Sequence, residues 1–418
     1  MTDGPGNAEA QTHWLEDPAH RAWLVRDAHL ALDFFDSSPR DGGGFHTLDL
    51  AGKPLAGDVQ ELHTTTRLVH SYALARMAGR EDRAGIIDRG MDFLWNGHRD
   101  LQHGGYLWSV DGDGAADGIK LAYGHVFVLL AASSAKMAGH PDADRLLADI
   151  AEVLDRHYWD EEQGLFRDEF TREWQPFSTY RGMNANMHGV EALLTAHEAT
   201  GEGEYLARAG RILDFFIAGQ AAAEDWRIPE HYDQNWRPDR GYAGNPMFRP
   251  AGTTPGHSFE MARLLLQYWD LAGRPDGQAP ARARALVERA LADAWDEERQ
   301  GFAYTLKFGG EVDNPARYWW PVTEAIGALA VLIKLERRDD DEGWYRRLWT
   351  FADAYLVDHR HGGWFPELDD ANRPTATQFA GKPDIYHALQ ADLLPLAPGL
   401  SRAAEALQAE RPLERAGS

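Results

Sequence analysis

The stretch "QHGGYLWSVDGDG" (residues 102–114) contains the unit from which the fold is built. Two glycines precede an aromatic residue, strand-forming residues follow, and Asp and Gly then signal a turn, so the stretch predicts a short β-hairpin. The pattern returns at 40–54, 161–170, 298–311 and 361–374, and in a degenerate form at 225–239. The chain is therefore divided into six repeats.

The spacing of these hairpins predicts the fold class. Marker glycines recur about every sixty residues, with one interval of twice that length around the degenerate hairpin, at Gly44, Gly105, Gly164, Gly301 and Gly363. Between hairpins lie paired segments, such as 65–79 and 83–97, whose apolar residues fall three and four apart, as in amphipathic helices. Six repeats of a hairpin and two helices predict about twelve helices.

Such a chain can form an open α-solenoid or close into an all-α (α/α)6 barrel with short β-hairpins between repeats. Six units without a polar capping repeat favour closure, because an open solenoid needs polar ends. No Pro/Ser-rich linker or block of charge divides the chain. We therefore predict one domain over residues 1–418, with a core at about 20–398 and loose termini.

Composition excludes several function classes. Among 418 residues, 42 Lys and Arg stand against 66 Asp and Glu, a net charge of −24. Such a surface repels phosphate backbones and anionic lipid, so we expect neither nucleic acid nor membrane as a partner. The absence of cysteine excludes disulfides and thiolate chemistry. The first residues have neither the basic start nor the apolar run of a signal peptide, which predicts a cytoplasmic protein.

Polar residues open the helix that follows each hairpin. They come about 20–24 residues after the marker glycine, or at the matching place in the degenerate repeat, and are Arg67, His125, His188, His257, Glu324 and His387. In a closed barrel, equivalent positions of the repeats converge at one end of the axis. A binding scaffold has no need to direct these groups at its own axis, whereas an active site does.

The segment "AGTTPGHSFEM" (251–261) predicts a helix start, with Thr254 as N-cap and Pro255 in the first turn. His257 then lies in that turn, with Glu260 on the same face. Pro321 and Pro383 mark the starts of the helices that carry Glu324 and His387.

Other histidines have plainer interpretations. His125 is expected to be a cap or core residue, while His63, His70 and His197 are typical of ordinary helix faces. His188 follows two asparagines and fits a local cap network as well as a functional role.

Arginine and tryptophan add to the candidate site. Burying Arg67 among apolar residues requires a carboxylate or polar ligand beside it. Trp319 and Trp320 could form a wall on which a sugar stacks. No HExxH, HxH or carboxylate cluster with ligand spacing is found, nor a GxSxG elbow or a phosphate-binding loop, so we expect no metal and no cofactor.

Several stretches in order resemble the N-acylglucosamine 2-epimerase superfamily, from about residue 20 to about residue 398. The most specific are "GTTPGHSFEMARLL" (252–265) and "GKPDIYHALQA" (381–391), with "YRGMNANMHGVEA" (180–192) after the third hairpin. Within the superfamily the likeness is strongest to its aldose–ketose isomerases, which act on mannose or sulfoquinovose. The resemblance implies an (α/α)6 barrel, a cofactor-free site and isomerisation through a cis-enediol.

The resemblance also implies roles for individual residues. His257 and His387 fall at the proton-transfer positions, and His188 falls where a histidine assists ring opening. Positions that contact or adjoin substrate are implied for Arg67, Tyr123, Asn184, Arg249, Glu260 and Trp320.

The residues suit this chemistry independently. A histidine can both take and return a carbon-bound proton at neutral pH. A helix N-terminus disfavours imidazolium at His257, and Arg67 could stabilise an enediolate oxygen. We expect His387 to be the base and His257 its partner, although the sequence does not order the two. Glu260 could fix the tautomer of His257 or bind a sugar hydroxyl.

The predicted activity is interconversion of D-mannose and D-fructose, extending to related sugars such as lyxose, by a monomer or homodimer. A sulfoquinovose isomerase and a sugar 2-epimerase remain alternatives. The segment around Arg249 and the residue Pro383 depart from the sulfoquinovose pattern and favour a neutral monosaccharide. From other classes, an (α/α)6 glycoside hydrolase could use Glu260 and Glu324, and a non-catalytic sugar binder would use no base.

Overall fold

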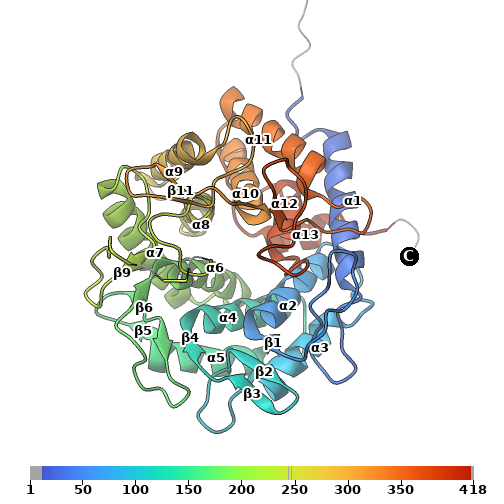
Figure 1. Ribbon diagram of the computed structural model, residues 1–418, viewed down its shortest axis with the longest axis vertical. Coiled ribbons are helices and arrows are strands. Elements are labelled where there is room, and N and C mark those ends of the chain that lie inside the picture. Colours follow the sequence, from blue (N-terminus) through green and yellow to red (C-terminus); the bar gives the residue numbers. More distant parts are fainter. Residues whose placement is uncertain (1–11, 243, 246, 416–418) are drawn as a thin grey trace, which may run out of the picture.

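Two concentric rings of helices make up the computed structural model, which describes residues 12–242, 244–245 and 247–415 (Figure 1). The inner ring consists of α2 (Leu62–Met77), α4 (Ala122–Met137), α6 (Met183–Thr200), α8 (Pro255–Leu271), α10 (Trp319–Leu335) and α12 (Tyr386–Leu396). The outer ring consists of α3 (Ile86–Phe93), α5 (Ala143–Val153), α7 (Gly203–Leu213), α9 (Ala279–Ala294), α11 (Asp339–Phe351) and α1 (Pro18–Phe35). The predicted (α/α)6 barrel is therefore confirmed.

The two rings differ in how their helices are buried. Inner helix α10 is buried at every position from Trp319 to Ile333, because it packs against α8, α12 and α11 at once. Outer helix α3 buries only one face, through Ile86, Ile87, Gly90 and Met91. These patterns explain why the inner segments are apolar all round and the outer ones amphipathic. Four outer helices end in π-helical turns at Leu94–His98, Leu154–Tyr158, Asp214–Ala221 and Ala352–Leu356.

The ring is closed by helices from opposite ends of the chain. Helix α12 packs against α1 on its outer side and against α2 beside it, so the first helix completes the last repeat (Figure 1). Beyond the expected core, α13 (Ala403–Glu410) also packs against α2. Leu407 and Leu413 are buried there, so the described C-terminal residues are packed rather than loose as predicted.

Short strands join neighbouring repeats as well as forming local hairpins. Local pairs are β2 (Ser109–Asp111) with β3 (Gly114–Asp117), β5 (Trp159–Asp160) with β6 (Leu165–Phe166), and β10 (Thr305–Leu306) with β11 (Val312–Asn314). Pairs between repeats are β1 (Gln60–Glu61) with β2, β4 (Lys120–Leu121) with β7 (Glu169–Phe170), β8 (Arg181–Gly182) with β9 (His231–Tyr232), and β12 (Arg317–Tyr318) with β13 (Glu367–Leu368). Bridges from Thr253 to Leu306 and from Leu48 to Lys382 complete the circuit. The strand before each inner helix is thus held by the next repeat.

The double glycines make a tight turn that a buried cation closes. Gly104 and Gly105 have φ of +76° and +65°, a left-handed conformation that favours glycine. Lys120 donates to the carbonyl of Gly104 and pairs with Asp100 at 3.0 Å. Lys382 makes the same contacts with Gly362 and Asp358 in the last repeat. Lys120 and Lys382 lie five residues before His125 and His387, so they tie these two turns to the starts of α4 and α12.

Within the described chain, none of the helices has the length and apolar composition that crossing a bilayer requires.

Candidate active site

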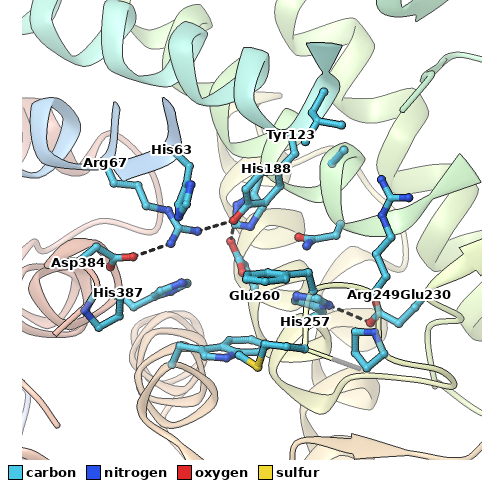
Figure 2. Close-up of a pocket in the computed structure, with 18 of the residues that line it drawn as sticks. His63, Arg67, Tyr123, His188, Glu230, Arg249, His257, Glu260, Asp384 and His387 are labelled. Carbon is cyan, nitrogen blue, oxygen red and sulfur yellow. Dashed lines mark hydrogen bonds and ion pairs between the residues drawn. The ribbon is translucent and has the colours of Figure 1, made fainter. Parts of the chain in front are cut away.

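A cavity of about 370 Å³ lies at the end of the barrel where the inner helices begin. The nine residues to which the resemblance gave a role all line it, namely Arg67, Tyr123, Asn184, His188, Arg249, His257, Glu260, Trp320 and His387; most of them are labelled in Figure 2. They come from inner helices α2, α4, α6, α8, α10 and α12, except for Arg249, which precedes α8. The convergence expected from the repeat spacing is therefore observed for Arg67, His188, His257 and His387, whereas His125 and Glu324 do not line the cavity.

His257 is paired with a carboxylate that the sequence did not single out. Its Nδ1 lies 2.8 Å from Oε1 of Glu230, which is 3% exposed (Figure 2). A carboxylate at Nδ1 keeps the proton on that nitrogen and leaves Nε2 as the free acceptor. The prediction that Glu260 fixes this tautomer is wrong, because Glu230 occupies that position. Thr254 stands at the N-cap as expected, yet its hydroxyl makes no capping bond.

Gly256 explains how His257 lies against an aromatic wall. A Cβ atom there would be 2.2 Å from a ring carbon of Trp320, so only glycine admits the indole. The ring centroid of Trp320 lies 5.1 Å from that of His257 and 5.9 Å from that of His387. Trp319 lines the cavity beside it. The two tryptophans form a wall next to both imidazoles, as predicted.

His387 has its own carboxylate on the neighbouring inner helix. Its Nδ1 lies 2.8 Å from Oε1 of Glu324, whose Oε2 accepts from Arg263 at 3.0 Å. Burial opposes ionisation of Glu324, but Arg263 and His387 outweigh it and hold its pKa below the ordinary value. Pro383 does not start this helix as predicted. It lies three residues before Tyr386, where α12 begins.

His188 lies between two further carboxyl groups. Its Nδ1 is 3.4 Å from Glu260 and 3.9 Å from Glu191, and burial lowers its pKa to about 4, so the ring is neutral near pH 7. Burial and the nearby Glu324 raise the pKa of Glu260 well above its usual range. Burial therefore favours the neutral form of Glu260, and neither of its oxygens has a hydrogen-bond partner. His188 takes no part in the cap network, where Asn186 bonds Phe166 and Gly182.

Arg67 meets the carboxylate that its burial requires. Its Nη1 donates to Asp384 at 2.6 Å, and its Nη2 donates to the hydroxyl of Tyr123 at 2.8 Å (Figure 2). The guanidinium lies 4.7 Å from the centroid of Phe127 and 4.8 Å from that of Tyr386. Asp384 stands inside the quoted "GKPDIYHALQA" segment, so its position beside the histidine was the signal available in the sequence.

Arg249 lies across the cavity from Arg67 (Figure 2) and is also paired. Its Nη2 donates to Glu169 at 2.6 Å, and its guanidinium lies 4.0 Å from the ring centroid of Tyr180. Asn184 also lines the cavity, and its Oδ1 is buried without a partner. An unsatisfied buried acceptor at a cavity wall is a position for a ligand hydroxyl.

Four other histidines were interpreted in the sequence analysis, and the structure places each of them. His63, interpreted from sequence as an ordinary helix-face residue, instead lines the cavity and stacks on Trp108 at 5.1 Å. His125 is a core residue as expected, accepting from the backbone of Tyr106. His70 is buried and bonded to Ser134, and His197 bonds the backbone of Glu202.

Glu324 does not line the cavity, so the carboxylate pair considered for a hydrolase does not face a common ligand. Its two oxygens are bonded to His387 and Arg263. Retaining and inverting glycosidases both need two carboxyl groups flanking one bond. This pair therefore gives no support to glycoside hydrolysis.

One group of side chains has the spacing of metal ligands. His188, Glu191 and Glu260 place possible ligand atoms within 4.8 Å of one another. Arg263 lies 3.7 Å from Glu260, and burial raises the pKa of Glu260, which favours its neutral form. A divalent cation binds ionised carboxylates, and the charge of a neighbouring guanidinium repels it. These residues therefore fit a metal poorly.

The fold and cavity together define a class, namely (α/α)6-barrel proteins with histidine–carboxylate pairs and an indole wall around a small polar ligand. The chain belongs to the N-acylglucosamine 2-epimerase family, whose model matches residues 43–391.

D-mannose isomerase from Thermobifida fusca is 40% identical over 94% of this chain and 98% of its own length. D-mannose isomerase from Pseudomonas cannabina pv. alisalensis is 37% identical over 95% and 98%. A crystal structure of D-mannose isomerase superposes with a TM-score of 0.85 at 29% identity, covering 91% of this chain and 99% of that one. The resemblance found in the sequence is thereby confirmed.

Proposed function

We propose that this protein is a D-mannose isomerase, which interconverts D-mannose and D-fructose by proton transfer through a cis-enediol. The observation that carries the proposal is the placement of two histidine–carboxylate pairs, His257–Glu230 and His387–Glu324, beside one tryptophan in a single cavity. Identity of 37–40% to two D-mannose isomerases over nearly the whole chain supports the same activity.

The reaction begins with ring opening. A proton leaves the O1 hydroxyl as the bond between C1 and O5 breaks and O5 gains a proton, which leaves an aldehyde at C1. His188 is suited to this exchange because it is neutral, so Nε2 can accept one proton and return another. Glu260 beside it is a neutral acid that can donate a hydrogen bond to a sugar oxygen.

The carbonyl then moves from C1 to C2. One imidazole takes the C2 proton through Nε2, the electrons of that bond form a C1–C2 double bond, and O1 becomes the enediol oxygen. Arg67 is placed to stabilise the negative charge that develops there. Return of the proton to C1, together with passage of the O2 hydroxyl proton to O1, gives the ketose with its carbonyl at C2. The carboxylates behind His257 and His387 stabilise the imidazolium that forms at each transfer.

The charge of the cavity favours a neutral sugar. Among the described residues that line it, the two arginines are both paired with carboxylates at 2.6 Å. A sulfonate or phosphate would have to displace Asp384 or Glu169 from its guanidinium. The chemistry requires only acids, bases and a carbonyl, so we propose that the site works without a metal or cofactor.

A 2-epimerase is the second candidate, because two imidazoles in one cavity could protonate opposite faces of C2. The test is proton NMR of EDTA-treated protein with D-mannose in D₂O, with glucose and sulfoquinovose in parallel. We expect fructose to appear with deuterium in the sugar. Glucose as the early product would assign an epimerase, turnover of sulfoquinovose alone would overturn the substrate, and no exchange into any sugar would refute the enediol mechanism.

A further inference from the structure

Arg263 lies behind the cavity without lining it, and it is among the most buried side chains of the protein. It is 2% exposed, stands on α8 three residues after Glu260, and does not line the cavity of the candidate active site. Its Nη2 is 3.0 Å from Glu324 and 3.7 Å from Glu260. A fully buried guanidinium is costly unless carboxylates compensate it, so this position calls for an explanation.

Three glutamates from three inner helices surround Arg263. Glu191 comes from α6, Glu260 from α8 and Glu324 from α10, and each of them interacts electrostatically with Arg263. Burial alone would neutralise all three. Hydrogen bonding and nearby positive charge instead hold the pKa of Glu191 and of Glu324 below their ordinary values, whereas that of Glu260 is raised. Arg263 therefore lies among two glutamates whose pKa is lowered, Glu191 and Glu324, and one whose pKa is raised, Glu260.

We propose that Arg263 is a positioning residue for proton transfer, which acts through Glu324 to keep His387 as an oriented free base. The contact between Nη2 and Oε2 leaves Oε1 of Glu324 for the Nδ1 proton of His387, at 2.8 Å. With that proton fixed, the lone pair of Nε2 is available to the sugar. This inference rests on the proposed function, because it assigns a role within the same proton-transfer step.

The loss of positive charge at position 263 determines the direction in which the pH dependence changes. Without the guanidinium, Glu324 is a buried carboxylate near two other glutamates, so the His387–Glu324 pair binds a proton more tightly. The pair then keeps that proton up to a higher pH, so His387 becomes a free base only at that higher pH. The other titratable groups that interact with Arg263 or Glu324 are Glu191, Glu260, Tyr386, His387 and His70. Burial lowers the pKa of His70 to about 4, so this ring does not replace the charge of Arg263 at Glu324.

A small cavity lies beside Arg263 on the side away from the active site. Its volume is about 70 Å³, and three buried polar atoms without partners belong to residues that line it, namely Nε of Arg263, Nε2 of His70 and Nε2 of Gln390. Such a polar space can hold one or two waters. A shorter cation at position 263 can therefore be solvated there, which makes Arg263→Lys a usable variant.

The test compares Arg263→Gln, which removes the charge, with Arg263→Lys, which keeps it. The pH dependence of kcat and KM for mannose is measured between pH 5 and 9. We expect Arg263→Gln to move the acid limb of kcat to higher pH by about one unit and to lower kcat at pH 7 by up to about tenfold, with KM changed less. Arg263→Lys should restore the wild-type limb.

The matched control is Arg80→Gln. Arg80 is similarly buried and paired with two carboxylates, Asp33 and Asp36, but belongs to the turn after α2, far from the histidines in sequence and contacts. The Arg80→Gln substitution should lower the unfolding temperature without moving the acid limb of the pH dependence of kcat. An unchanged limb in folded Arg263→Gln, or an equal shift in Arg80→Gln, would overturn the proposal.

A second measurement separates this inference from the proposed function. Histidine labelled at Cε1 is followed by NMR in the ligand-free protein, with His387→Asn identifying the signal. The titration midpoint of that signal should rise by about one unit in Arg263→Gln. A rise without turnover of any sugar in the wild type would refute only the proposed function, whereas turnover without the rise would refute only the role of Arg263.

Discussion

Glu230→Gln provides the sharpest test of how His257 works. The substituted amide can still accept the Nδ1 proton through its carbonyl, so the tautomer is kept while the negative charge is lost. Glu230 is 3% exposed and 2.8 Å from Nδ1, a geometry in which a charged hydrogen bond contributes about 1.5–3 kcal/mol. That contribution is greatest when His257 becomes imidazolium, as it does in the transition state.

A loss of about 2–3 kcal/mol from the transition state corresponds to a 30- to 150-fold decrease in kcat. KM should change little, because the neutral ring keeps its orientation. The acid limb of the pH–rate profile should move to lower pH, since the carboxylate no longer favours imidazolium, which is opposite to the effect expected for Arg263→Gln. The assay is steady-state conversion of mannose to fructose across pH, with circular dichroism to establish folding.

Glu169→Gln is the matched control for this variant. Glu169 is another buried glutamate at the cavity end of the barrel, but it pairs with Arg249 rather than with a histidine. Its loss should affect KM more than kcat. If folded Glu230→Gln kept kcat within threefold of wild type, or if only its KM rose, the role given to the His257–Glu230 pair would be wrong.

Three further outcomes are expected. Gly256→Ala should lower kcat/KM by about 10- to 100-fold, because the new methyl displaces Trp320 from both imidazoles, and a crystal structure with an unmoved indole would contradict this. Burial raises the pKa of Asp27 from 3.8 to about 6. The contribution of Asp27 to the free energy of unfolding is therefore complete below about pH 4, and about 3 kcal/mol is lost as pH rises through 6. Chemical denaturation at several pH values should show this decrease in the wild type and not in Asp27→Asn. Dialysis against EDTA should leave turnover unchanged, and recovery of lost activity by a divalent cation would instead assign the metal-ligand group at His188.

The sequence predicted those parts of the fold that local signals encode. A glycine with positive φ marks the hairpin in five of the six repeats, at Gly44, Gly105, Gly164, Gly301 and Gly363, so the spacing of these glycines indicated the number of units and the end of the barrel at which Arg67 and the histidines meet. The pairing of strands between repeats was not predictable, because Leu48 and Lys382 are brought together only by closure of the ring. The pairing of α1 with α12 was missed for the same reason.

The candidate site likewise contains residues that the repeat spacing could identify and residues that it could not. His257 and His387 were found because their repeat positions mark them, whereas the carboxylates that orient them carry no such mark. Glu230 comes from the hairpin of the same repeat as His257, directly before β9, and Glu324 comes from α10 in the repeat before that of His387. Only the contacts of the folded chain identify such partners. Glu260 lay on the predicted face of its helix, but in the structure it lies 3.4 Å from His188 and does not pair with His257.

Closure of the ring by α1 has a consequence for the order in which the protein matures. During synthesis α1 emerges first and its packing partner α12 emerges more than 350 residues later, so α1 must stay undocked while the five middle repeats assemble. Because α12 carries His387, the second imidazole joins the first only when the two ends of the barrel meet. A nascent or truncated chain can therefore bury most of its core and still be inert, which makes catalytic activity a direct report on completed folding.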